Sequence, residues 1–256
     1  MKLEASNITV SAHGRSIVDG ANLALVSGEL VGLIGPNGAG KSTLLRALLG
    51  ITRRDAGRVT LDGADFDAMS SPARARAVAF LPQERRVEWR LTAHDVVMLG
   101  RYPHQAGLGS ATPADREAVQ RAIAAVEGED LTKRPVSVLS GGERTRILLA
   151  RALAVEAPLL LTDEPIAALD PYHQLHVMEI LRQRARAGAG VLAVIHDLSL
   201  AARFMDRLVL MDSGRIVAEG SPAEALSPER LASVYRISAV AGSNAGAPYI
   251  LPWSRS

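Results

Sequence analysis

The segment that most constrains this chain is a glycine-rich turn between an expected strand and an expected helix. Residues 30–34 read LVGLI, an apolar run of strand length that suits a strand covered on both faces. Residues 35–43 read GPNGAGKST and lead into a helical pattern; we call them the phosphate loop. Their glycines let the backbone N–H groups converge on an anion, to which the following helix adds its positive N-terminal end. This order of elements predicts an α/β layered fold.

The phosphate loop also carries the residues that nucleotide chemistry needs. Lys41 would place one positive charge between the β- and γ-phosphates, and Ser42 would offer its hydroxyl to Mg²⁺. An ordinary glycine turn is the alternative, but a chance match to this pattern is rare in a chain with three lysines. The residues expected to bind the nucleotide are Gly35, Pro36, Asn37, Gly38, Ala39, Gly40, Lys41, Ser42 and Thr43.

Two adjacent carboxylates end a second apolar run. Residues 159–165 read LLLTDEP, so Asp163 and Glu164 directly follow an expected buried strand. Asp163 would hold Mg²⁺, as acidic strand-end residues do in phosphoryl-transfer sites, and Glu164 would polarise the attacking water. A solvated strand end is the alternative for this pair alone, and the phosphate loop favours the metal and base roles.

A second anion-binding turn is expected at residues 139–143, LSGGE, which we call the signature turn. A serine and two glycines precede an amphipathic helix, whose N-terminus would again attract an anion. A capped helix start without a ligand is the alternative. Because the chain already has one phosphate loop, Ser140, Gly141 and Gly142 make sense as groups that contact the nucleotide of another copy of the chain.

The order of the remaining patterns predicts one domain with an inserted lobe. Further buried strands are expected at 78–81 and 191–195, with antiparallel strands near the N-terminus and a hairpin turn at 212–214. The stretch of about residues 91–150 reads as a mostly helical lobe inserted in the α/β core.

The expected domain covers residues 1–238. The chain over 239–256 holds Gly, Ser, Ala and Pro without periodicity, and we expect it to be loosely structured.

Composition excludes several classes of protein. The formal net charge is only +2, which argues against a strongly cationic nucleic-acid binder, and the chain has no cysteine for a disulfide scaffold. No run approaches the roughly 18 to 20 apolar residues of a membrane span, and the N-terminus does not resemble a secretory signal. We therefore expect any role at a membrane to be exerted from its surface.

Taken together, these motifs resemble the ATP-binding-cassette ATPases over nearly the whole chain, from about Leu3 to Tyr235. GPNGAGKST, LSGGE, LLLTDEP, AALD and VIHD stand in the order and approximate spacing of that family. The resemblance implies a P-loop nucleotide-triphosphatase core with a RecA-like mixed sheet and flanking helices, an N-terminal antiparallel sheet and an inserted helical subdomain. It also implies ATP and Mg²⁺ as ligands.

The same resemblance assigns roles to three further residues. Gln83 matches the glutamine that senses Mg²⁺ and the attacking water, and His196 matches the histidine that contacts the γ-phosphate. Asp170 matches the loop that crosses an ATP-sandwich dimer of two copies. The sequence departs from the family at Ala12, where an adenine-stacking aromatic residue is usual and His13 stands beside it. It departs again where Thr145 replaces glutamine and Ile166-Ala167 replaces threonine-serine.

One short segment favours import over export. Residues 100–104, GRYPH, resemble the branch that imports ferric siderophores, heme and cobalamin; a surface turn is the alternative. The resemblance implies a bacterial importer subunit peripheral to the cytoplasmic face of the inner membrane, with two transmembrane permease subunits and, indirectly, a substrate-binding protein as partners. We expect no nucleic-acid partner, and molybdate or zinc stays open as cargo.

Two other functions use the same phosphate loop. A soluble cassette ATPase in DNA repair or translation usually carries two cassettes, a coiled coil or a zinc module, and a small-molecule kinase lacks the signature turn. A basic cluster has two interpretations, a solvated surface or a docking surface for an acidic loop of a membrane partner. Its members are Arg74, Arg76, Arg85, Arg86 and Arg90.

Overall fold

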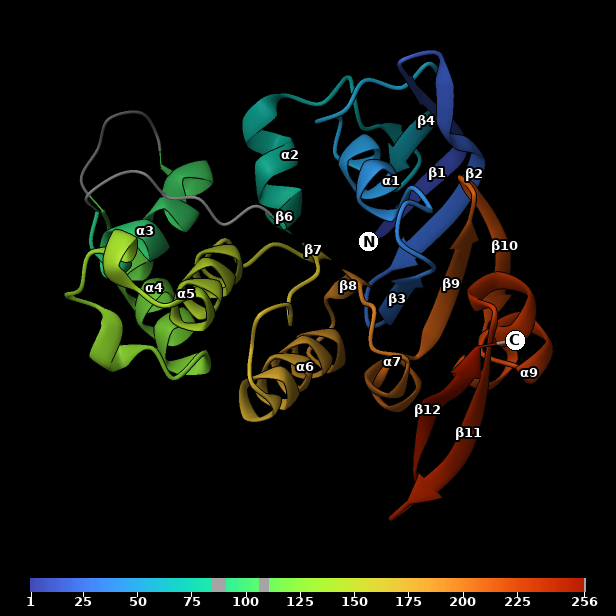
Figure 1. Ribbon diagram of the computed structural model, residues 1–256. Coiled ribbons are helices and arrows are strands. Elements are labelled where there is room, and N and C mark those ends of the chain that lie inside the picture. Colours follow the sequence, from blue (N-terminus) through green and yellow to red (C-terminus); the bar gives the residue numbers. More distant parts are fainter. Residues whose placement is uncertain (84–90, 106–110, 256) are drawn as a thin grey trace. The chain divides into compact units, whose positions relative to one another are not determined.

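The computed structural model describes residues 1–83, 91–105 and 111–255. The chain divides into two compact units (Figure 1). The first unit joins Met1–Ala68 to Arg184–Ser256, and the second is Met69–Gln183. The helical lobe expected from the sequence falls inside the second unit, which also contains strands of the α/β core.

An antiparallel sheet forms the N-terminal part of the first unit, as the sequence predicted. Its strand order is β2 (Arg15–Val26), β1 (Lys2–Ala12), β4 (Ala56–Leu61) and β5 (Ala64–Asp65). Alternate residues of β1 point into the core, which is the pattern of a sheet with one solvated face. His13 and Gly14 both have positive φ and close the β1–β2 hairpin as a two-residue turn.

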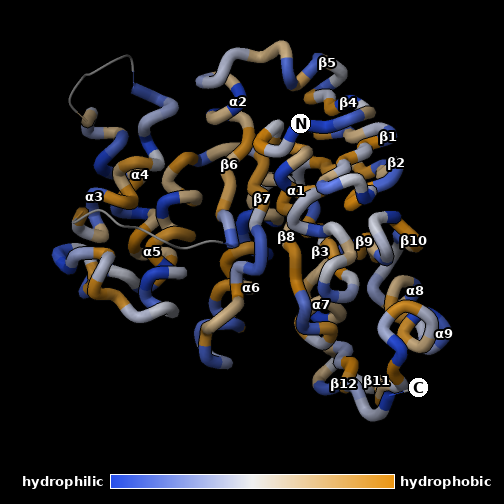
Figure 2. Tube along the Cα trace, turned by 45° about the horizontal axis from the view of Figure 1, so that its top comes forward, coloured by the Kyte–Doolittle hydropathy of each residue, from blue (hydrophilic) through white to orange (hydrophobic). Residues whose placement is uncertain are grey.

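A mixed sheet lies at the centre of the first unit. The strand β3 (Leu30–Ile34) pairs in parallel with β8 (Gly190–Val194) on one side and with β9 (Arg207–Asp212) on the other. The last strand, β10 (Arg215–Gly220), is antiparallel to β9. All residues of β3 and β8 are buried, and Figure 2 shows β8 as apolar along its length.

The expected turn between β9 and β10 is confirmed, because Ser213 and Gly214 have φ values of 48° and 85°. Helices of this unit are α1 (Lys41–Leu48), α7 (Leu198–Phe204), α8 (Pro222–Ala225) and α9 (Pro228–Arg230), followed by a π-helical turn, η4 (Leu231–Tyr235).

The chain beyond residue 239 does not form the loose tail that we expected. It folds as an antiparallel hairpin of β11 (Ile237–Asn244) and β12 (Ala247–Arg255), which Figure 1 shows in red. The hairpin is held by α7, because the Ser199 hydroxyl donates to the Ile250 carbonyl at 2.6 Å and accepts from the Ile250 N–H at 3.1 Å. That anchor lies about fifty residues away in sequence, so the local composition of the tail could not reveal it.

In the second unit, β6 (Val78–Leu81) and β7 (Leu159–Asp163) form a parallel pair, which confirms two more predicted strands. The inserted lobe is helical, as expected, and α3, α4 and α5 pack on one another within it. The helical elements of this unit are α2 (Ser71–Ala77), α3 (Ala93–Met98), η1 (Leu99–His104), α4 (Pro113–Ala125), η2 (Glu129–Leu131), η3 (Val136–Val138), α5 (Gly141–Ala154) and the start of α6 (Pro171–Arg186).

The GRYPH segment forms η1 and is fixed from inside the lobe. Arg101 is only 6% exposed, and its guanidinium donates to Asp115 at 2.9 Å, to the Ala154 carbonyl at 2.8 Å and to Glu156 at 3.0 Å. His104 donates from Nε2 to the carbonyl of Val155 at 2.8 Å. A surface turn therefore describes this segment poorly, because the Arg101 and His104 side chains tie it to the end of α5.

Burial does not leave Arg101 as an isolated charge. Hydrogen bonds from Thr112 and then from Arg101 lower the pKa of Asp115 from 3.8 to about 2, so this carboxyl is ionised at neutral pH. The buried cation thus has a buried anion beside it, as the desolvation cost of both requires.

Of the basic cluster, Arg74 and Arg76 lie on α2, and the Arg76 guanidinium donates to the Pro103 carbonyl at 3.1 Å. Arg85, Arg86 and Arg90 lie outside the described residues. Within the part of the chain that the structure describes, no helix is both long and apolar enough to cross a bilayer.

Candidate functional site

The phosphate loop connects β3 to α1, and the fold of its own chain requires two of its glycines. A Cβ on Gly35 would lie 2.1 Å from the carbonyl oxygen of Met211 on β9. A Cβ on Gly40 would lie 2.5 Å from the carbonyl oxygen of Ile17 on β2, and Gly40 has a φ of +96°. Both positions thus need glycine for space and for backbone conformation.

Lys41 is the first residue of α1 and is 5% exposed. Its ammonium donates to the carbonyl oxygens of Gly35 and Pro36, both at 2.8 Å. The side chain is therefore folded onto the loop that it serves, and its charge adds to the positive end of α1. Because Asn37 and Gly38 are exposed, the outer part of the loop is open to a ligand.

Sequence reasoning missed one neighbour of this loop. The Tyr235 hydroxyl, at the end of η4, is hydrogen-bonded to the backbone of Gly35, and burial raises the pKa of this phenol. The residues between Gly35 and Tyr235 span most of the chain, so no local sequence signal pointed to this contact. The contact braces the start of the phosphate loop from the C-terminal part of the unit.

His196 lies at the same edge of the sheet as the phosphate loop. It follows β8, and β8 pairs in parallel with β3, whose next residue is Gly35. The imidazole is exposed, and the next residue, Asp197, caps α7 by accepting from the Leu200 N–H at 2.7 Å. The first unit thus brings together the phosphate loop and the histidine that the sequence predicted.

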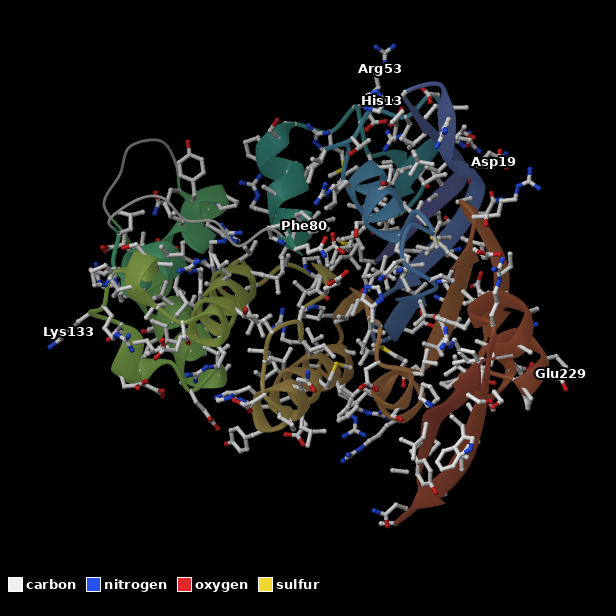
Figure 3. All side chains as sticks on the ribbon, viewed as in Figure 1. His13, Asp19, Arg53, Phe80, Lys133 and Glu229 are labelled. Atoms are coloured by element: carbon white, nitrogen blue, oxygen red, sulfur yellow. The ribbon has the colours of Figure 1, made fainter. Side chains whose placement is uncertain are left out.

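At the position where an adenine-stacking ring was considered, the structure has the tip of the β1–β2 hairpin. His13 is exposed there, as Figure 3 shows, and Ala12 ends β1. Among the described residues, the His13 ring has no contact with another aromatic ring.

In the second unit, three residues with expected catalytic or metal-binding roles follow or end the paired strands β6 and β7. Leu81 pairs with Thr162, so Gln83 and Glu164 are matched two residues further along two parallel strands. Asp163 is fully buried at the end of β7, Glu164 is half-buried and Gln83 is exposed. The carboxyl ends of adjacent parallel strands share one edge, so the structure has these three residues at the same edge of the β6–β7 pair.

Glu164 has a left-handed backbone with φ of 53°, and Ala168 in the same loop has φ of 63°. Non-glycine residues adopt this region at a cost of about 1–2 kcal/mol each. The loop from Glu164 to Asp170 therefore holds its carboxylate in a conformation that an unconstrained strand end would leave.

The signature turn is built as a capping box at the start of α5. The Glu143 N–H donates to the Ser140 hydroxyl at 3.2 Å, and the Glu143 carboxylate accepts from the Ser140 N–H at 2.8 Å. That N–H, followed by Arg134, lowers the pKa of Glu143. Thr145 is fully buried and its hydroxyl donates to the Gly141 carbonyl at 2.8 Å, so the residue that replaces the family glutamine faces inward.

The two glycines of the signature turn have room for side chains. Nothing lies within 4 Å of a Cβ placed on Gly141, and a Cβ on Gly142 would meet only Leu169 and Ala168, at 3.4 and 3.9 Å. Neither glycine has a positive φ. The chain itself therefore does not require glycine at either position.

Asp170 caps α6 and is exposed. It accepts from the His173 N–H at 3.0 Å and from the His173 imidazole at 2.7 Å. Both bonds, the backbone one first, lower the pKa of this carboxyl. A Cβ on Gly142 would lie 3.4 Å from Leu169, so the signature turn lies beside the loop that ends at Asp170.

Comparison with known proteins agrees with these motifs. The model of the ABC transporter family matches residues 18–167. The cobalamin import ATP-binding protein BtuD of Halobacterium salinarum is 42% identical over 245 residues, which cover 95% of this chain and 61% of that protein. The chain thus spans less than two thirds of the length of this relative.

Two other relatives match over most of their own length. The hemin import ATP-binding protein HmuV of Streptomyces coelicolor is 44% identical, over 90% of this chain and 82% of the relative. The iron(3+)-hydroxamate import ATP-binding protein FhuC of Bacillus subtilis is 38% identical, over 93% and 88%.

Solved structures share the fold. A metal-chelate type ABC transporter in an inward-facing conformation has a TM-score of 0.83 at 24% identity and covers 98% of this chain and 97% of its own. A dimeric ATP-binding cassette with ADP and phosphate bound has a TM-score of 0.77 at 25% identity, over 86% and 98%. With its phosphate loop, signature turn and strand-end carboxylates in this mixed α/β fold, the chain belongs to the ABC transporter family.

Proposed function

We propose that this chain is the ATP-binding and ATP-hydrolysing subunit of an importer for a cobalamin, hemin or ferric hydroxamate type of substrate. The observation that carries the ATP chemistry is the phosphate loop, whose glycines are fixed by Met211 and Ile17 and whose lysine is buried against its carbonyls. The direction of transport and the class of cargo are supported by relatives that are named for import of these three compounds.

The donor set fits Mg²⁺ bound to ATP. Ser42, Gln83 and Asp163 offer hydroxyl, amide and carboxylate oxygens, which are the ligands that this hard cation prefers. When bound, Mg²⁺ neutralises charge on the phosphate oxygens. Asp163 contributes its carboxylate from a fully buried position at the end of β7.

The reaction depends on positioning by residues of this chain. N–H groups of residues 35–43 and the Lys41 ammonium hold the phosphates, and Glu164 accepts a proton from the attacking water. Gln83 orients that water from the adjacent strand end, and His196 contacts the γ-phosphate. The left-handed backbone of Glu164 supports this role, since strained residues cluster where a side chain must be aimed.

A second copy of the chain would complete each site. Gly141 and Gly142 have space for a Cβ and ordinary φ values, so their glycines are not explained by the chain alone. Bare backbone at an exposed helix N-terminus suits close approach of a phosphate group from outside. We therefore assign Ser140, Gly141 and Gly142 to the ATP held by the partner copy, with Asp170 at the same interface.

A groove on the second unit would receive the permease. It has a volume of about 230 Å³ and opens to solvent. Its lining is mostly apolar and comes from α2, β6, η1 and α5, with Phe80, labelled in Figure 3, and the exposed Leu99 among its members. Gln83 follows the strand that lines this groove, so a permease segment seated there would be coupled to the ATP site.

We propose that the chain acts at the cytoplasmic face of the inner membrane, with two permease subunits as direct partners and a substrate-binding protein as an indirect one. Hydrolysis removes the phosphate bridge between the two copies, and the dimer opens. The opening passes through the helical lobe to the permease.

Replacing Glu164 by glutamine tests the ATP chemistry. The Glu164→Gln variant should lose turnover by about 10²-fold or more while it still binds ATP, because the amide cannot accept the proton. Steady-state ATPase rates and nucleotide titration measure the two effects, and light scattering should show the variant as a dimer with ATP. Glu117→Gln, on an exposed face, is the matched control. Turnover near that of the wild type would remove Glu164 from the general-base role.

The cargo is tested in the assembled transporter. With the permease and binding protein in liposomes, one of the ferric hydroxamate, heme or cobalamin substrates should stimulate ATP hydrolysis and accumulate inside. No stimulation by any of the three, with basal hydrolysis intact, would overturn the assignment to these three classes of cargo and leave the ATPase assignment standing.

A further inference from the structure

Asp170 is held more firmly than a helix cap requires. A helix cap uses one side-chain oxygen, which here accepts from the His173 N–H at 3.0 Å. The second carboxylate oxygen accepts from Nδ1 of the same histidine at 2.7 Å. An exposed carboxylate would otherwise rotate freely, so these two bonds set the direction in which Asp170 points.

His173 is itself restrained by its neighbour. Its imidazole meets the Tyr172 ring edge to face, with the ring centroids 5.2 Å apart and the planes at 90°. The Tyr172 hydroxyl donates to the Glu127 carboxylate, at 3.2 and 3.3 Å from its two oxygens. Tyr172 is 62% exposed, so packing in the core does not explain a tyrosine at this position.

Glu127 connects this group to the helix that begins at the signature turn. It follows α4 and has a φ of 51°. The Arg146 guanidinium, on α5, donates to the carbonyls of Val126 and Glu127 at 3.0 and 2.7 Å. A continuous set of contacts therefore leads from α5 through Glu127 and Tyr172 to His173 and Asp170.

We infer that His173 is a positioning residue for Asp170, and that Tyr172 and Glu127 tie that position to the signature-turn helix of the same chain. The inference rests on the proposed function, in which Asp170 and the signature turn both face the partner copy. The two elements must arrive at the partner in a fixed relation, and this set of contacts provides it in addition to the closeness of Leu169 to Gly142. Exposed pairs of this kind contribute little to stability, which fits a role in positioning.

Asparagine and glutamine at position 173 distinguish the need for a donor at the position of Nδ1 from the need for a side chain of similar size. Asparagine places its amide N–H close to the position of Nδ1, whereas glutamine places it nearer to Nε2. His173→Gln and His173→Ala should lower kcat for ATP about 10-fold and change KM less than about twofold, because a small misplacement affects the closed state more than binding. His173→Asn should keep at least about half of the wild-type kcat. Tyr172→Phe retains the ring and should lower kcat less than His173→Ala.

A double-mutant cycle excludes an indirect loss of folding. In an Asp170→Ala background, His173→Ala should have no further effect on kcat, because it acts only through the carboxylate that is gone. Urea unfolding of the His173 and Tyr172 variants should stay close to that of the wild type, whereas the Asp170→Ala background loses the cap of α6 and should be less stable. Wild-type kcat in the alanine and glutamine variants, an asparagine variant as slow as alanine, or additive effects in the cycle would overturn the inference.

The proposed function fails separately. If the wild-type chain has no ATP turnover, or if Glu164→Gln does not reduce it, then the ATPase assignment is wrong and the role of His173 falls with it. If that control behaves as expected and the His173 series does not, only the positioning role is wrong.

Discussion

The phosphate loop and the signature turn are both glycine-containing turns that start a helix, yet their glycines have different causes. In the phosphate loop, a Cβ on Gly35 or Gly40 would lie within 2.5 Å of a carbonyl oxygen of the same chain. In the signature turn, Gly141 has open space around it and Gly142 has ordinary contacts. Contacts within the chain therefore require glycine in the phosphate loop. No contact within the described part of the chain requires glycine in the signature turn, yet its backbone carries no side chain there.

On the proposed function, this difference separates the part of the ATP site that the chain shapes for its own nucleotide from the part that it offers to the nucleotide of the partner copy. In the phosphate loop, the Lys41 ammonium donates to the Gly35 carbonyl, and Tyr235 is hydrogen-bonded to the backbone of Gly35, the first residue of the loop. In the signature turn, hydrogen bonds between Ser140 and Glu143 cap α5, and the two glycines are left open to contact from outside the chain. Glycine at a helix start costs stability relative to alanine, so its presence there points to an approach by something external.

Gly40→Ala should give the largest effect. Its Cβ would overlap the Ile17 carbonyl at 2.5 Å with φ at +96°, so the free energy of unfolding should fall by about 3 kcal/mol and ATP binding should be lost. Gly38→Ala is the matched control, because φ is +80° but nothing lies within 4 Å, and it should cost about 1 kcal/mol. Urea unfolding measures both. Equal losses at the two positions would remove the close contact as the reason for Gly40.

Gly141→Ala should behave in the opposite way. Stability should be unchanged or higher by up to about 1 kcal/mol, since alanine is the better helix former. ATP turnover should fall about 10-fold or more, which corresponds to about 1.4 kcal/mol in the activation free energy. Nucleotide affinity of the isolated chain should not change. A variant with full turnover would mean that the bare backbone of the signature turn has no role at the partner's ATP.

Ser140→Ala tests whether the signature turn is held by its own cap. The variant loses the hydroxyl that accepts from the Glu143 N–H, and the free energy of unfolding should fall by about 1 kcal/mol. Thermal or urea denaturation measures the change. A loss as large as that of Gly40→Ala would show that the fold depends on the signature turn as strongly as on the phosphate loop. It would contradict the difference drawn between the two turns.

Glu143→Gln should give the smallest change, and one that depends on pH. The Ser140 N–H and then Arg134 lower the pKa of Glu143 below its ordinary value of 4.5. The carboxylate therefore stabilises the folded state above pH 4.5, and this contribution is lost as pH falls through the lowered pKa. The difference in unfolding free energy between wild type and variant should be largest near neutral pH and shrink in acid. A constant difference would assign the effect to shape alone.

The fold was predictable wherever the signal is local. Apolar runs of strand length located β3, β6, β7 and β8. Asp163 and Glu164 were found as candidate site residues because they directly follow one of these runs. These features depend on spacing within one segment, which the sequence displays directly.

Features that depend on distant partners were not predictable. The C-terminal hairpin needed the Ser199 contact, and Tyr235 needed the phosphate loop, both far away in the chain. Arg101 looked like a turn residue because its partners Asp115 and Glu156 come from two other segments. The two hydrogen bonds between His173 and Asp170 join residues that are close in sequence, but only the side-chain rotamers show that Nδ1 faces the carboxylate.

The GRYPH segment has a consequence for how such chains are sorted by cargo. Its glycine sits where a Cβ would lie 2.3 Å from the Arg151 carbonyl, and its arginine and histidine bind the end of the same helix. Those contacts are internal, whereas Pro103 lines the proposed permease groove and Tyr102 is exposed. The motif therefore reflects how the helical lobe is assembled. Two ATPase subunits that share it can serve permeases that transport unrelated substrates.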